Sequence, residues 1–217
     1  MVITSKLTDE ELIESIYKAA NAYEKLEDNT YLIIGKNKRS EYYWFQCHFD
    51  KKNFMHLLGI KSQTLSADEF YERCIKHNID DNVKIAISDC TPSRNHSRTT
   101  INEKCSCCAD MLNINDAVYM KVGDKNKISQ YVDFSYAYGN IATMGFSAKN
   151  TDVCFPITLI PKNIDEFASK KYRIVFVFEK SDSEDKYKFP LIEIKKDLFL
   201  ECYEEMPDDL KELIIWK

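Results

Sequence analysis

Residues 141–160 have the sequence IATMGFSAKNTDVCFPITLI, which contains two of the strand candidates that decide the fold, at 141–146 and 153–160. Short apolar runs rich in β-branched and aromatic residues are typical of β-strands. Turn sequences at 123–126 and 139–140 contain glycine and asparagine and favour hairpins. The second half of the chain is therefore predicted to be a series of strands. The other strand candidates there are 118–122, 128–138, 172–179 and 187–194.

The first half of the chain has mainly helical signals. Capping-box sequences at 8–11, 66–69 and 100–103 predict three helix starts. Apolar residues recur at helical spacing from Leu12 to Leu26, which predicts one buried helix face. Shorter helices are expected at 164–168 and after Pro207, and another at 53–60 is expected to stop at Gly59. Two strands, 31–34 and 42–49, are expected between the helices.

Helices followed by strands indicate the α+β class. The expected architecture is a set of N-terminal helices packed against an antiparallel β-sheet formed mainly by the C-terminal half. A chain of 217 residues with 44% hydrophobic and 30% charged residues can bury a core without metals or disulfides. Five glycines and five prolines argue against long linkers.

Composition and charge limit where the protein acts and what it binds. No apolar stretch is long enough to span a bilayer, and residues 1–15 lack the apolar segment of a secretion signal. We therefore expect a cytoplasmic protein without membrane association, and we interpret its eight cysteines as free, buried thiols. The net charge of −5 counts against a protein that coats nucleic acid non-specifically. A local basic cleft remains compatible with it.

Residues 49–59, FDKKNFMHLLG, resemble the Phe-x-x-x-Asn-Phe-x-His-Leu-x-Gly signature of a phage-associated branch of the barnase/EndoU/colicin/RelE-like nucleases. Other segments match this branch in the right order, so the resemblance covers residues 28 to 192. Two features depart from the pattern: Thr158 replaces a more usual serine, and the cysteine cluster at 105–108 is not part of it. The further matching segments are 70–71, 98–104, 140–146, 155–160 and 172–180.

The resemblance implies a domain division and a site. An N-terminal helix would occupy residues 1–27, the nuclease-like domain 28–196, and an acidic extension with a short helix 197–217. RNA cleavage through the 2′-hydroxyl needs a base, an acid and cations, but no metal or other cofactor. His56 is the first candidate for acid or base, because its ordinary pKa lies near neutrality. The other implied catalytic residues are Arg98, Lys104 and Thr158, and the implied substrate-binding residues are Lys52, Arg94 and His96.

A positive helix N-terminus near Thr100 would help to bind phosphate. Each candidate also has a structural interpretation. His56 lies between the apolar residues Met55 and Leu57, so its alternative interpretation is a core histidine hydrogen-bonded to a backbone carbonyl. Arg98 and Lys104 also fit ordinary solvated charges, and for Lys104 the two interpretations are evenly balanced. Thr158 fits an ordinary strand residue. We interpret His48 and His77 as structural residues. His48 could nevertheless lie beside His56.

The cysteine cluster allows a zinc hypothesis. Cys105, Cys107 and Cys108 would bind the metal together with Cys90 or His96. Structural zinc sites usually pair one Cys-x-x-Cys with a second pair, and that second pair is missing here. We therefore favour packed thiols and expect no bound metal.

Two kinds of function fit these observations. The leading hypothesis is a metal-independent endoribonuclease, an RNA-binding toxin or effector encoded by a phage or mobile element and active in host–virus interaction. The alternative is a non-catalytic binding protein on a nuclease-like fold that inhibits or sequesters a defence-system component or nucleotide messenger. A protein partner would then be a cognate inhibitor or a defence protein. The position of His56 relative to Arg98, Lys104 and Thr158 discriminates between them.

Overall fold

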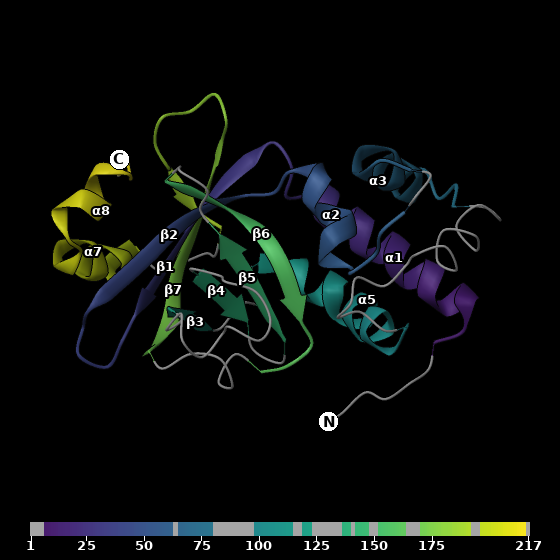
Figure 1. The fold of residues 1–217 in the computed structure, drawn as a ribbon. Helices are drawn as coiled ribbons and strands as arrows, with labels where there is room; N and C mark the ends of the chain where they lie inside the picture. The colour runs from purple at the N-terminus through teal and green to yellow at the C-terminus, as the bar shows by residue number, and fades with distance from the viewer. Residues whose placement is uncertain are drawn as a thin grey trace.

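A computed structural model describes residues 7–62, 65–79, 98–114, 119–122, 136–139, 142–147, 152–163, 170–191 and 196–215. Its helices are α1 (Asp9–Glu24), α2 (Lys51–Leu57), α3 (Ala67–Ile75), α5 (Arg98–Leu112), α7 (Lys196–Glu205) and α8 (Asp208–Glu212). Its strands are β1 (Asn29–Lys36), β2 (Tyr42–His48), β3 (Tyr119–Val122), β4 (Tyr136–Gly139), β5 (Thr143–Ser147), β6 (Val153–Ile160), β7 (Lys170–Ser181) and β8 (Phe189–Pro190). Helices α1, α2, α3 and α5 gather on one side of the sheet, and α7 and α8 lie on the other (Figure 1). None of the described helices is long and apolar enough to cross a membrane.

The strands form one sheet in the order β1-β2-β6-β5-β4-β3-β7-β8. Strand β7 also pairs with β1, so the sheet closes back on itself. The strand pairs are antiparallel except β2 and β6, which run parallel. The predicted α+β class is therefore confirmed, while the sheet is mixed and takes two strands from the first quarter of the chain. The parallel pairing extends only over Gln46–Val153 and Cys47–Cys154, so most of β6 is free of β2.

Local sequence signals explain where the helices begin and end. The capping boxes at Thr8 and Ser66 both form and start α1 and α3 as predicted. The third predicted helix also forms and ends at Leu112, but α5 begins at Arg98, so Thr100 lies in its first turn and not at its N-cap. Helix α2 ends before Gly59, which has a φ of 72° that costs a glycine little.

Two hydrophobic clusters hold the layers together. The larger joins α1, α2, α3 and α5 to the sheet through fully buried residues such as Tyr23, Phe54 and Phe70. The smaller joins α7 and α8 to the opposite face of β1 and β7, where Phe199 packs edge-on against Phe176 at 5.1 Å. Each fully buried side chain of this size contributes about 1.5–3 kcal/mol. Strand β1 is buried on both faces because it lies between the two clusters.

Some expected elements differ from the structure or fall outside it. Helix α7 was not predicted, and the strand expected at 187–194 is only two residues long within the described part of the chain, at β8. The helix expected at 164–168 and residues 128–135 of an expected strand lie outside the described residues. The helix expected after Pro207 is confirmed as α8.

Candidate active site

Helix α2 is fixed at its N-terminus by two hydrogen bonds to its N-cap residue, Asp50. The Asp50 side chain caps it by accepting a hydrogen bond from the Lys52 backbone N–H at 2.9 Å. The Tyr23 hydroxyl on α1 donates to the Asp50 carbonyl at 2.8 Å. Phe54 and Leu57 on the inner face of α2 are fully buried. This anchoring leaves the opposite face, which carries His56, at the surface.

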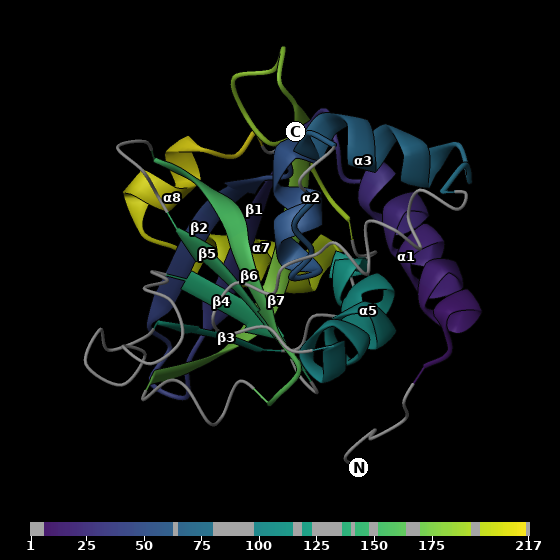
Figure 2. The same ribbon diagram turned by 45° about the vertical axis from the view of Figure 1, so that its right-hand side comes forward.

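Helix α2 lies beside the part of β6 that β2 leaves unpaired. It contacts both β6 and α3 and is seen between them in Figure 2. Opposite it, β5 pairs with β6 through Gly145–Thr158 and Phe146–Pro156, so Ile157 is an extra residue in a β-bulge. Bulges change the direction of a strand and are common next to active sites. Here the bulge presents a backbone carbonyl to α2.

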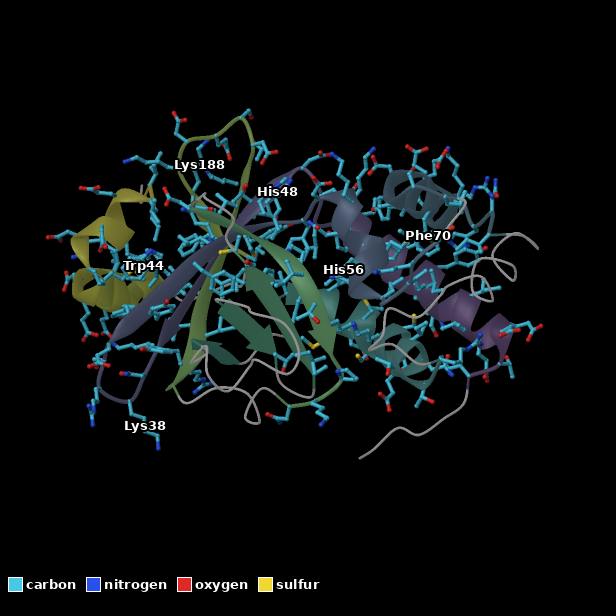
Figure 3. All side chains as sticks on the ribbon, in the orientation of Figure 1. Lys38, Trp44, His48, His56, Phe70 and Lys188 are labelled. Carbon is cyan, nitrogen blue, oxygen red and sulfur yellow. The ribbon has the colours of Figure 1, made fainter. Side chains whose placement is uncertain are left out.

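His56 makes a hydrogen bond to that carbonyl. Its ring N–H donates to the backbone oxygen of Ile157. In a neutral imidazole one nitrogen is a donor and the other an acceptor, so this bond reserves the second nitrogen for accepting a proton. The His56 side chain is exposed, and Figure 3 shows it where α2, α5 and β6 meet. The backbone-carbonyl bond of the structural interpretation is present, but His56 is not a core residue.

Three influences lower the pKa of His56, and one raises it. The crowding of the ring by protein atoms lowers the pKa most, followed by the positive charges of Lys104 and Lys61. The hydrogen bond to Ile157 raises the pKa. The net pKa lies below the ordinary value of 6.5, so His56 is mostly neutral at pH 7 and able to act as a base.

Lys104 supplies the second group of the site. It projects from α5, is only 4% exposed, and lies close enough for its charge to influence His56. Burial lowers its pKa to about 8. Within the described part of the chain, no carboxylate forms an ion pair with it. Burying an unpaired ammonium costs free energy, and such perturbed groups cluster at functional sites.

The two other predicted catalytic residues lie differently. Thr158 follows Ile157 in β6, pairs with Gly145, and is 6% exposed. Its hydroxyl is therefore held beside the bulge. Arg98 binds elsewhere: its guanidinium donates to Asp9 at 2.5 Å and to Asn102 at 3.1 Å, which links α5 to α1. The structure thus brings together His56, Lys104 and the bulge at Ile157 and Thr158. The guanidinium of Arg98 is instead bound to Asp9 and Asn102.

The predicted substrate-binding residues are only partly described. Lys52 is exposed on α2, four residues before His56, so both lie on one helix face. Arg94 and His96 lie outside the described residues. Lys61 was missed by the sequence reasoning, although one signal could have revealed it. No Asp or Glu occurs between Asp50 and Asp68, in a chain with 35 acidic residues.

His48 and His77, the other histidines of the described residues, contact groups other than His56 and Lys104. His48 lies 3.7 Å from Asp182 and edge-on to Phe155. His77 stacks on Tyr17 with ring centroids 4.4 Å apart. These contacts agree with the structural roles that we expected for both residues.

The cysteines of α5 pack into the protein interior. Cys105 and Cys108 are buried, and Cys107 is partly buried. Burial raises the pKa of Cys107 to about 12 and that of Cys108 as well, so neither thiol is reactive. Among the residues that the structure describes, no group of three or more His, Cys, Asp or Glu is arranged to hold a metal ion. Cys90, a proposed fourth ligand, lies outside them.

The fold and site define an α+β protein with a neutral histidine beside a buried lysine at a bulged strand. Over residues 15–196 the chain matches the family described as phage-Barnase-EndoU-ColicinE5/D-RelE like nuclease4. This match includes His56, Lys104 and Thr158 and extends beyond the resemblance seen from the motifs. The chain belongs to this family of nuclease-like proteins. No curated protein and no solved structure matched it.

Proposed function

We propose that this protein is a metal-independent endoribonuclease in which His56 and Lys104 perform acid–base catalysis. The observation that carries the proposal is the position of His56: its ring is held on the Ile157 carbonyl, beside a buried lysine. The family match supports a nuclease, and the choice of RNA rests on the chemistry of these two groups. A base and a cation are sufficient when the substrate supplies its own nucleophile.

The proposed reaction is an internal transesterification. The free nitrogen of neutral His56 accepts the proton of a ribose 2′-hydroxyl, and the 2′-oxygen attacks the adjacent phosphorus. The bond from phosphorus to the 5′-oxygen breaks as Lys104 stabilises the developing negative charge and donates a proton to the leaving oxygen. The products are a 2′,3′-cyclic phosphate and a free 5′-hydroxyl. We propose that the hydroxyl of Thr158, next to the bulge, donates a hydrogen bond to a phosphate oxygen.

The biological role that we propose is that of a toxin or effector encoded by a phage or mobile element. The phage association in the family description supports this role. An active ribonuclease of this kind harms the cell that makes it unless its site is blocked, so a cognate inhibitor is the protein partner that we propose. RNA in the cytoplasm is its proposed target.

Cleavage of matched RNA and DNA strands tests this function. The purified protein is incubated with labelled RNA and with DNA of the same sequence, in EDTA and in Mg²⁺. We expect RNA cleavage in EDTA, with 2′,3′-cyclic phosphate ends, and no cleavage of DNA. A single 2′-deoxy substitution at the mapped cut should abolish the reaction. A requirement for Mg²⁺, or cleavage of the deoxy substrate, contradicts the mechanism, and intact RNA under all conditions favours a non-catalytic binding protein.

A further inference from the structure

We propose that Lys52 and Lys61 bind the phosphates on either side of the one that is cleaved at His56. The substrate would then be an internal stretch of a polynucleotide chain, and not a dinucleotide or a chain end. This inference rests on the proposed nuclease function, which it extends from the reacting atoms to the length of the substrate. In the sequence, Lys52 precedes His56 by four residues and Lys61 follows it by five.

Lys52 lies on the N-terminal side of His56 within α2. The four-residue separation places both on one face of the helix, with Cβ atoms about 6 Å apart. Both are exposed, whereas Phe54 and Leu57 face the core. The Lys52 ammonium can therefore reach a phosphate bound next to the imidazole.

Lys61 follows the turn that ends α2, on the C-terminal side of His56. The Gly59 N–H donates to the His56 carbonyl at 2.9 Å, and the Ile60 N–H donates to the Met55 carbonyl at 3.1 Å. With the left-handed φ of Gly59, these bonds form a helix-ending motif that reverses the chain. Ile60 is buried and anchors the turn. Lys61 follows directly and lies close enough for its charge to influence His56.

Neither lysine is neutralised by a carboxylate of the described residues. The adjacent Lys51 differs, because it lies 3.9 Å from Glu72 on α3 and is directed away from the site. The segment from residue 51 to residue 67 contains no Asp or Glu, so its own charged side chains are all basic. Two lysines without a carboxylate partner among the described residues, one before and one after a neutral base, match an anion with several charges in a row, which is the nucleic-acid backbone.

Substrate length provides the kinetic test. A ribodinucleotide contains only the cleaved phosphate, and a pentanucleotide with the same central step contains phosphates on both sides. Lys52→Ala and Lys61→Ala should each raise KM for the pentanucleotide about fivefold, the loss of roughly one phosphate contact. Their kinetics on the dinucleotide should stay within about twofold of the wild type. Lys38→Ala is the matched control, since Lys38 lies in an exposed turn far from His56 (Figure 3).

Binding of a non-cleavable DNA pentanucleotide separates this inference from the proposed function. The double variant Lys52→Ala, Lys61→Ala should bind more weakly and lose about 1.4 from the slope of log affinity against log salt. If the wild type cleaves no RNA but the double variant still binds the DNA pentanucleotide more weakly, the proposed nuclease function is wrong and the proposed phosphate subsites are supported. Equal losses on both substrate lengths, or binding unchanged from the wild type, overturn the subsites. No binding of the pentanucleotide by the wild type also overturns them.

Discussion

The His56 ring donates a hydrogen bond to the backbone carbonyl of Ile157, the extra residue of the bulge in β6. This bond connects the end of α2 to a strand residue that lies 101 positions further along the chain. It fixes which ring nitrogen carries the proton and therefore which nitrogen can accept one. The bulge, which adds a residue opposite β5, is thus a part of the candidate site.

Replacement of His56 tests the catalytic role directly. His56→Ala should lower RNA cleavage by at least about 100-fold, because general base catalysis contributes that much or more. The variant should remain folded, since the side chain is exposed and loses one hydrogen bond worth about 1 kcal/mol. Initial rates on a labelled oligonucleotide, with circular dichroism as a folding check, measure both effects.

The matched control for this variant is His77→Asn. His77 is exposed, stacks on Tyr17, and has a φ of 49°, a conformation that asparagine tolerates well. Cleavage by His77→Asn should equal that of the wild type. If His56→Ala retains wild-type rates, His56 is not the base.

The pH dependence of cleavage should be bell-shaped. His56 must be neutral to accept a proton, so the rate should rise with pH through its lowered pKa, with a midpoint below 6.5. Lys104 must be protonated to donate one, so the rate should fall above its pKa of about 8. Plots of log kcat/KM against pH report both values for the free enzyme.

Lys104→Arg provides the control for the alkaline limb. An arginine stays protonated throughout this range, so the fall near pH 8 should disappear even if the maximal rate is lower. The acidic limb should remain, because His56 is unchanged. An alkaline limb that persists in this variant assigns the fall to another group.

Lys104 should make the protein less stable at neutral pH. The folded-state pKa of about 8 lies below the ordinary 10.5, so at pH 7 both folded and unfolded chains are protonated and the full burial penalty is present. This difference corresponds to about 3 kcal/mol. Lys104→Met keeps a similar side-chain length without the charge. It should therefore raise the free energy of unfolding at pH 7 while abolishing cleavage.

The advantage of Lys104→Met should shrink as pH rises from 8 towards 10.5. In that range the folded wild type loses the Lys104 proton before the unfolded chain does, so its burial penalty falls. Urea unfolding of both proteins at pH 7 and pH 10 measures the change. A variant that is less stable than the wild type at pH 7 would show that Lys104 has a favourable partner in the fold.

The sequence predicted the parts of this fold that depend on local signals. The capping boxes at Thr8 and Ser66 and the stop at Gly59 are short-range patterns, and they form as expected. The Thr100 pattern marked the right helix but placed its start two residues late, because α5 begins at Arg98. The parallel pairing of β2 with β6 and the closure of β7 on β1 join distant segments, and no local pattern encodes them.

The sequence predicted which residues belong to the candidate site, but not how they are arranged in space. His56, Lys104 and Thr158 came from motif positions, and the structure brings their three elements together. The role of Ile157 could not be foreseen, because it uses a backbone carbonyl and depends on a bulge. The pairing of Arg98 with Asp9 was equally hidden, since Asp9 lies 89 residues away in the sequence.

The ion pair between Arg98 and Asp9 makes a final prediction about which cations touch the substrate. Arg98 uses its guanidinium to bind Asp9 and Asn102, so Arg98→Ala should lower cleavage much less than His56→Ala, by under about tenfold. The pair is 42% and 53% exposed, and exposed pairs contribute about 1 kcal/mol or less to stability. Asp9→Asn is the informative partner variant, because it releases Arg98 without removing it. If Arg98 were a phosphate ligand restrained by Asp9, Asp9→Asn would lower KM and Arg98→Ala would raise it. We expect instead that both variants leave KM unchanged and reduce the free energy of unfolding slightly, as measured by steady-state kinetics and urea titration.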